Sequence, residues 1–277
     1  MKSINLTLKA LMSASFLLFS VLVSGQQQSP AATFEPQVGQ QGKDVVWVPT
    51  PQELVNKMLE IAHVGPSDFV IDLGSGDGRT VISAAKLGAR ALGVEFNPDM
   101  VALSRSNARK EGMNHLAEFV EGDLFETDLS KATVITMFLL PEINLRLRPK
   151  LLELKPGTRI VSNTLTMGDW QEDVEATTDE NWNSWNQAHL WIVPAKVEGT
   201  WKTGNGELKL TQKYQMLEGS YISGGKESRI REGRMKGDII SLTINDRIYT
   251  GRVQGNRIEG NIADSSGNSL REWTATR

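Results

Sequence analysis

A group of acidic and glycine residues in the first third of the chain has the types and spacing of a ligand-binding turn. An apolar run over residues 69–71 meets Asp72, and glycines follow at alternate positions, Gly74, Gly76 and Gly78. Glycines suit such a turn because the chain reverses with unusual dihedrals and lies so close to a ligand that a Cβ would clash. An ordinary strand-to-helix turn shares this pattern, so the neighbouring residues must decide between the two.

Two further acids follow strands that come later in the chain. Residues 91–95 read as a strand ending in Glu95, about twenty residues beyond the glycines, where a carboxylate can accept hydrogen bonds from both hydroxyls of a ribose. Residues 117–120 read as another strand, followed by Glu121, Gly122, Asp123 and Leu124. These signals favour a Rossmann-like site over an isolated turn.

The order of these signals resembles the class I S-adenosylmethionine-dependent methyltransferases. A dinucleotide dehydrogenase has the spacing G-x-G-x-x-G, whereas this turn has G-x-G-x-G after an acid. The resemblance implies S-adenosyl-L-methionine as cofactor and an α/β fold with a Rossmann-like doubly wound sheet. It also implies that Asp72 accepts hydrogen bonds from amides of the turn or, through water, from the amino group of the cofactor. Glu95 would bind the ribose, and Asp123 would accept a hydrogen bond from the adenine amino group. The full predicted cofactor-binding set is Pro49, Thr50, Asp72, Gly74, Ser75, Gly76, Asp77, Glu95, Asn97, Asp123 and Leu124.

A wider set of motifs over about 46–194 resembles the protein-lysine methyltransferase family that includes the mitochondrial enzymes acting on the ATP synthase c subunit. Its most specific parts are V-P-T-P at 48–51, D-L-G-S-G-D-G-R at 72–79, F-L-L-P-E-I-N-L at 138–145 and M-G-D-W at 167–170. The resemblance implies a protein-lysine N-methyltransferase with a protein substrate. A small-molecule methyltransferase and a non-catalytic exported binding protein, with a ligand-sensing Rossmann-like domain, are the alternatives.

The residues after the central strand at 132–140 are the candidates for handling the methyl acceptor. Glu142 is the first candidate for orienting an incoming amine, and Asn144 is the second. Amino-directed DNA methyltransferases carry D/N-P-P-Y/F here, whereas this chain has Leu139-Leu140-Pro141-Glu142. With a net charge of −3 and no strong basic stripe, we expect no nucleic-acid partner. Since the chain has no cysteine, we expect neither a disulfide nor a cysteine-based metal site, and no metal is predicted.

Local patterns also predict how some of these elements begin. Thr50 is expected to cap a helix, with Pro51 in the first helical position and Glu53 completing a capping box. Asn97, followed by Pro98, is expected to cap another helix. Three tryptophans lie close together in the sequence, at Trp170, Trp182 and Trp185. They can belong to the core, to an aromatic lid or to a cage for a cation.

The termini differ from the middle of the chain. Residues 1–25 have two lysines, a short apolar run and small residues, typical of a signal peptide or, alternatively, a membrane anchor. Residues 26–44 read as a flexible linker, 45–194 as the methyltransferase domain and 195–277 as a β-rich module forming an antiparallel small barrel or sandwich. We expect an exported monomer, periplasmic or secreted, that meets a membrane only if residues 1–25 stay uncleaved. Export conflicts with a cofactor made in the cytosol.

Overall fold

The computed structural model describes residues 34–43, 46–179 and 184–277. The predicted signal peptide and Trp182 lie outside these ranges. Within them, no helix is long and apolar enough to cross a membrane.

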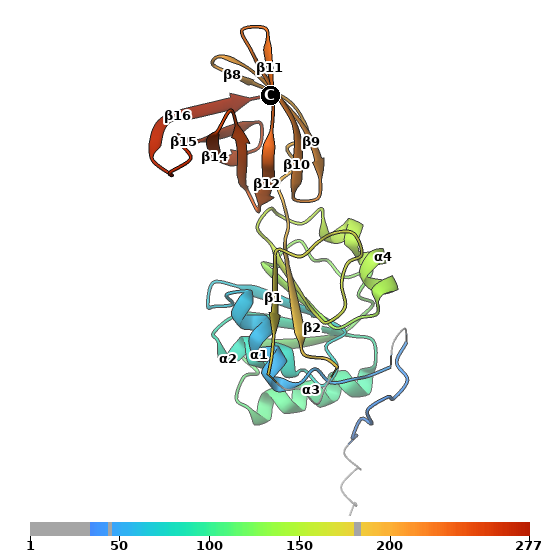
Figure 1. Cartoon of the computed structure of the whole chain (residues 1–277). Coiled ribbons are helices and arrows are strands. Elements are labelled where there is room, and N and C mark those ends of the chain that lie inside the picture. Colours follow the sequence, from blue (N-terminus) through green and yellow to red (C-terminus); the bar gives the residue numbers. More distant parts are fainter. Residues whose placement is uncertain (1–33, 44–45, 180–183) are drawn as a thin grey trace, which may run out of the picture. The chain divides into compact units, whose positions relative to one another are not determined.

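Residues 69–192 build a seven-stranded sheet in the order β3-β2-β1-β4-β5-β7-β6 (Figure 1). Strands β1 to β5 are parallel, whereas β7 is antiparallel to both β5 and β6. The order reverses direction between β1 and β4, which is the switch point where open α/β sheets bind ligands. The predicted Rossmann-like sheet is therefore confirmed. The strands are β1 (Phe69–Leu73), β2 (Arg90–Glu95), β3 (Ala117–Glu121), β4 (Val134–Met137), β5 (Arg159–Asn163), β6 (Val174–Thr177) and β7 (Gln187–Ile192).

Helices cover both faces of this sheet because its strands carry apolar side chains on each side. The helices are α1 (Gln52–Ile61), α2 (Arg79–Lys86), α3 (Pro98–Lys110) and α4 (Pro141–Leu151). Buried residues of α1, α2 and α3 share one core cluster with Val70 and Leu190, while those of α4 share the other with Ile71 and Trp191. Consecutive strand residues thus contact opposite helix layers, which makes the sheet a rigid support for the residues at its edge.

One of the two predicted helix caps is right and the other is wrong. Asn97 caps α3 as expected, because its side-chain oxygen accepts from the Asp99 amide at 2.9 Å. Helix α1 begins after Pro51, with no side-chain capping bond at that residue. The Thr50 hydroxyl instead accepts a hydrogen bond from Asn163 Nδ2 at 3.1 Å. A buried tertiary partner therefore takes the place of the local capping box.

Residues 199–276 form a closed antiparallel barrel of eight strands, which confirms the small β-barrel expected in this region. The ring closes because β9 pairs with both β8 and β10, while β11 pairs with β10 outside the ring (Figure 1). Closure leaves the ring without an open edge. The eight strands of the ring are β8 (Gly199–Thr203), β9 (Gly206–Lys213), β10 (Met216–Ser223), β12 (Arg231–Lys236), β13 (Ile239–Ile244), β14 (Arg247–Gln254), β15 (Arg257–Ala263) and β16 (Ser269–Thr276), and the additional strand is β11 (Lys226–Arg229).

The described part of the predicted linker contacts the rest of the fold. The Gly39 amide donates to the Trp47 carbonyl at 2.9 Å, and the Trp47 amide donates to the Gln40 carbonyl at 2.8 Å. These bonds place residues 39–43 beside the ligand pocket described below. The division of the chain at residues 44/45 and 194/195 stays a prediction.

Candidate active site

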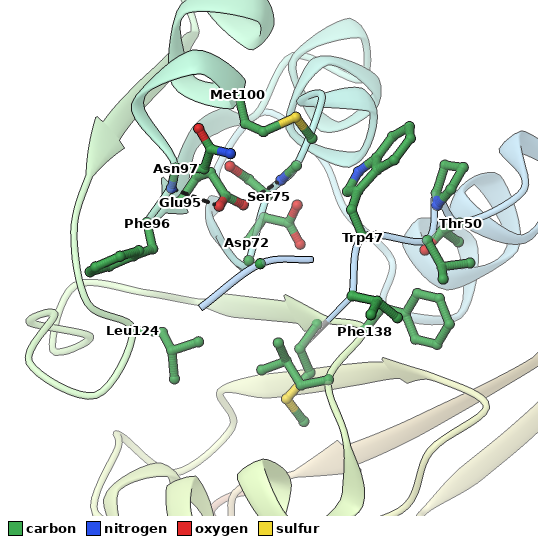
Figure 2. Close-up of a pocket in the computed structure, with 18 of the residues that line it drawn as sticks. Trp47, Thr50, Asp72, Ser75, Glu95, Phe96, Asn97, Met100, Leu124 and Phe138 are labelled. Carbon is green, nitrogen blue, oxygen red and sulfur yellow. Dashed lines mark hydrogen bonds between the residues drawn. The ribbon is translucent and has the colours of Figure 1, made fainter. Parts of the chain in front are cut away.

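A cavity of about 680 Å³ lies at the carboxyl ends of β1, β2 and β4 (Figure 2). Its size is that of a cofactor or drug-sized ligand site, for which ~300–1,000 Å³ is usual. All eleven residues of the predicted cofactor-binding set line this cavity. The sheet order therefore brings together acids that lie on different strands and far apart in the sequence.

Glu95 holds the glycine turn in shape. One carboxylate oxygen, Oε2, accepts from the Gly76 amide at 2.9 Å, and Oε1 accepts from the Asn97 amide at 3.0 Å. The amides of Gly74 and Ser75 both donate to the Val94 carbonyl, at 2.9 and 3.0 Å. A carboxylate has about four acceptor positions, so Glu95 can hold the turn and still accept from ribose hydroxyls.

Asp72 is a buried carboxylate beneath the turn. Its Oδ1 accepts from the Thr136 hydroxyl at 2.6 Å, and the residue is 6% exposed. Burial raises the pKa of Asp72 to about 7, the Thr136 hydrogen bond works against that rise, and the nearby charges of Glu95 and Asp77 add to it. A positively charged group in the cavity would favour the ionised form of this carboxyl.

An ion pair joins the turn to the segment that precedes α1. Asp77 pairs with Arg79, whose Nη2 lies 2.6 Å from Oδ2, and Arg79 Nη1 donates to the Thr50 carbonyl at 2.9 Å. Asp77 thus connects the turn to the segment before α1 through Arg79, and it also lines the cavity. Through this contact, the predicted V-P-T-P segment and the glycine turn form one unit.

Asp123 already has a cationic partner. Lys43 Nζ lies 2.6 Å from its Oδ2, and the Phe125 amide donates to Oδ1 at 2.8 Å. The hydrogen bond from Lys43, followed by that from the Phe125 amide, lowers the pKa of Asp123. Lys43 also lies 4.6 Å from the centre of the Phe96 ring, which lines the cavity. Lys43 and Phe96 were absent from the predicted set because Lys43 falls in the expected linker and no motif marks Phe96.

Aromatic side chains form another wall of the cavity. Trp47 lies beside the glycine turn, since a Cβ built on Gly76 would come within 2.7 Å of its indole Nε1 (Figure 2). Phe138 and Trp185 meet edge to face with their ring centres 5.1 Å apart, and both line the cavity. Of these residues, the sequence marked Trp185 as a candidate for an aromatic lid, and Phe138 begins the motif at 138–145.

The remaining predicted residues lie elsewhere. Glu142 is exposed in the first turn of α4, just beyond the cavity-lining residues Leu139 and Leu140. Asn144 is fully buried and donates to the carbonyls of Leu165 and Thr166, both at 3.2 Å, which gives it a structural contact. Neither residue lines the cavity, so a catalytic role for either stays a prediction.

Trp170 and Trp185 have different surroundings. Trp170 is fully buried in the core beside Trp191, with ring centres 6.3 Å apart. Trp185 lies at the cavity instead. Of the alternatives open for these residues, Trp170 therefore belongs to the core and Trp185 to an aromatic wall.

The cavity fits S-adenosyl-L-methionine by volume and by charge. Gly76 has φ +53° and no room for a Cβ, so the turn offers bare backbone to a ligand. Carboxylates at Asp72, Glu95 and Asp123 suit a ligand that carries a sulfonium, an ammonium, a ribose and an amino group. These residues would hold the cofactor, with Glu95 and Asp123 at its ribose and adenine ends.

Comparison with known proteins agrees with this fit. The family described as the ANTKMT methyltransferase domain matches residues 72–174. A protein-lysine N-methyltransferase of Saccharolobus islandicus is 44% identical over 153 residues, which are 54% of this chain and 94% of that protein. The human ATP synthase c-subunit lysine N-methyltransferase is 38% identical over 128 residues, which are 46% of this chain and 54% of that protein. The chain thus spans about half the length of this human methyltransferase.

A solved structure shares the fold of the same region. It is the crystal structure of an RNA methyltransferase from Salinibacter ruber in complex with S-adenosyl-L-homocysteine. It is 45% identical, with a TM-score of 0.51, and the match covers 54% of this chain and 96% of that one. Its ligand is the demethylated form of the cofactor that the cavity fits.

Proposed function

We propose that this chain, which belongs to the protein-lysine N-methyltransferase family, transfers a methyl group to a lysine side chain of a protein. It is an S-adenosylmethionine-dependent methyltransferase. The observation that carries the lysine proposal is the 44% identity to the Saccharolobus islandicus enzyme over 94% of its length. The carboxylate-lined cavity with its glycine turn supports the same proposal.

The reaction needs alignment more than acid–base chemistry. When bound, the cofactor would supply a sulfonium methyl group for displacement by the lysine nitrogen, with S-adenosyl-L-homocysteine as the leaving group. The lysine must first lose a proton to water, because the usual pKa of a lysine ammonium is about 10.4. The glycine turn, held by Glu95, fixes one reactant in place. Trp47, Phe138 and Trp185 line the same cavity, and their apolar rings would limit the access of water to the bound reactants.

Glu142 supports an entry point for the lysine. It is exposed in the first turn of α4, two residues after the cavity-lining Leu140. An exposed carboxylate there attracts an ammonium group without entering the cavity. Glu142→Gln should raise KM for the protein substrate several-fold and leave kcat nearly unchanged. A kcat loss with KM unchanged would contradict this positioning role.

RNA is the second candidate acceptor, because the Salinibacter ruber structure at 45% identity is described as an RNA methyltransferase. The deciding experiment incubates the full chain and labelled cofactor with protein, RNA and small-molecule fractions from a strain that lacks this chain and from its matched parent. Label in methyl-lysine of a defined protein from the deletion strain, at a site already methylated in the parent, supports the proposal. Label confined to RNA or to small molecules overturns it, and Gly76→Arg should abolish transfer in every fraction.

We also propose that the enzyme is exported, on the basis of residues 1–25 alone. Fractionation of cells that express the full chain, with mass spectrometry of its amino terminus, tests this. A cleaved amino terminus near residue 25 in the envelope fraction is expected, whereas an intact chain in the cytosol would refute export.

A further inference from the structure

Three side chains able to ligate a metal ion gather at the β6 edge of the seven-stranded sheet. They are Glu172, Glu175 and His189, and one ligand atom from each lies within 4.8 Å of the others. Glu175 on β6 and His189 on β7 are direct register partners in the antiparallel pair. Because Leu190 packs in the core with α1, the alternating His189 faces the opposite side of the sheet.

His189 adds a buried imidazole to the two carboxylates of this cluster. The residue is only 5% exposed, yet neither ring nitrogen has a hydrogen-bond partner among the described residues. Its Nδ1 points to Glu172, whose Oε1 is 3.7 Å away, too far for a hydrogen bond. A buried polar group that is left unpaired destabilises the fold, and nearly all such groups in native structures have a partner.

The distances suit an ion between the side chains. Two ligands of a tetrahedral ion, each about 2.1 Å from the metal, are separated by about 3.4 Å. The measured 3.7 Å between His189 Nδ1 and Glu172 Oε1 is close to that separation. The ligand oxygen of Glu175, an exposed side chain, lies within 4.8 Å of the other two ligand atoms.

The backbone around the cluster is already held in place. The Asp173 amide donates to the Leu190 carbonyl at 2.7 Å, and the Ile192 amide donates to Asp173 Oδ2 at 2.8 Å. These bonds fix the chain between Glu172 and β6. Gln187 Nε2 also donates to Glu175 Oε1 at 3.2 Å, the kind of support that orients carboxylate ligands of metals.

We propose that Glu172, Glu175 and His189 bind a divalent transition-metal ion. One imidazole nitrogen with two carboxylates favours Zn²⁺ and its first-row neighbours over Mg²⁺ or Ca²⁺, which prefer all-oxygen sites. The ion ties the edge strand β6 to β7, the strand that Trp185 shortly precedes in the chain. Since Trp185 contacts Phe138 at the cavity, the metal stabilises part of the aromatic wall. The site does not depend on the identity of the methyl acceptor.

Zinc titration of the full chain tests the proposal. The chain is purified without a histidine tag, stripped with a chelator and titrated with Zn²⁺ by calorimetry, alone and in excess Mg²⁺. We expect one saturable site per chain that Mg²⁺ does not displace. Both Glu175→Gln, an exposed change that leaves the fold intact, and His189→Gln should weaken Zn²⁺ binding at least tenfold. The control Glu118→Gln removes the same charge from β3, the opposite edge of the sheet, and should bind as the native chain does.

A second readout identifies the ligands. Co²⁺ bound to the native chain should show visible absorption bands typical of a four- or five-coordinate site, and these bands should be lost in Glu175→Gln. Circular dichroism checks that each variant is folded. The proposal is overturned if the native chain has no saturable Zn²⁺ site, or if folded Glu175→Gln binds Zn²⁺ as tightly as Glu118→Gln does.

Discussion

Glu95 and Gly76 are joined by a hydrogen bond of 2.9 Å from the glycine amide to the Glu95 carboxylate, across 19 residues of sequence. The carboxylate that the sequence assigns to a ribose is therefore also the support of the ligand turn. Substituting Glu95 should therefore remove the predicted ribose contact and also loosen the turn.

Glu95→Ala should weaken cofactor binding by about 1–3 kcal/mol, which is a rise in Kd of roughly 5- to 150-fold. Glu95→Gln keeps one acceptor oxygen and should lose less. Calorimetry with S-adenosyl-L-homocysteine measures both, with Glu118→Gln as the matched control. An affinity equal to that of the control would show that Glu95 does not contribute to cofactor binding.

Gly76→Ala should destabilise the protein for two separable reasons. The backbone has φ +53°, a conformation that costs a residue with a Cβ roughly 1–2 kcal/mol, and the new Cβ would lie 2.7 Å from Trp47 Nε1. In a Trp47→Ala background only the backbone cost remains, so the loss of melting temperature should be smaller. Thermal unfolding of the four proteins of this cycle gives the coupling. Equal losses in both backgrounds would contradict the close approach of Trp47.

Asp72 should make stability depend on pH. Its pKa is raised to about 7 in the folded chain, against about 4 when unfolded, so the folded state holds a proton that the unfolded state has lost. This contribution is fully present below pH ~4, falls as pH rises toward ~7, and is lost above it, by an amount on the order of a few kcal/mol.

Denaturant unfolding between about pH 4 and about pH 8 measures that slope. Asp72→Asn should flatten it, because the amide keeps an acceptor for Thr136 and cannot ionise. The control Glu118→Gln should retain the native slope. Parallel curves for Asp72→Asn and the native chain would show that Asp72 does not titrate in this range.

Lys43→Ala should tighten cofactor binding modestly. Lys43 Nζ lies 2.6 Å from the Asp123 oxygen that is predicted to receive the adenine amino group, and it adds positive charge to a site for a cationic ligand. The pair is partly exposed, so the gain should be at most about 1 kcal/mol, or up to about fivefold in Kd. Lys43→Arg, which keeps the charge, is the control for titration by calorimetry. Weaker binding of Lys43→Ala would mean that Lys43 contacts the cofactor itself.

Much of the site was readable from the sequence because its signals are local. Alternate glycines after Asp72, and acids at the ends of strands, identify a turn and a sheet edge within short stretches of chain. Every strand that carries them runs parallel in the observed sheet, so Glu95 and Asp123 lie at one cavity. Asn97 followed by Pro98 likewise determined the start of α3, since capping involves neighbouring residues only.

The tertiary structure decided the partners of these residues. Thr136 donates a hydrogen bond to Asp72 across 64 residues of sequence, and Lys43 pairs with Asp123 across 80. Asn163 donates to the hydroxyl of Thr50, the residue expected to cap α1, across 113 residues. Each bond contributes only about 1 kcal/mol, so no local pattern encodes it. The pairing of β1 with β4 brings Thr136 to Asp72, and the pairing of β6 with β7 brings His189 to Glu175. The sequence alone therefore predicted the residues that line the cavity, and packing determined what holds them in place.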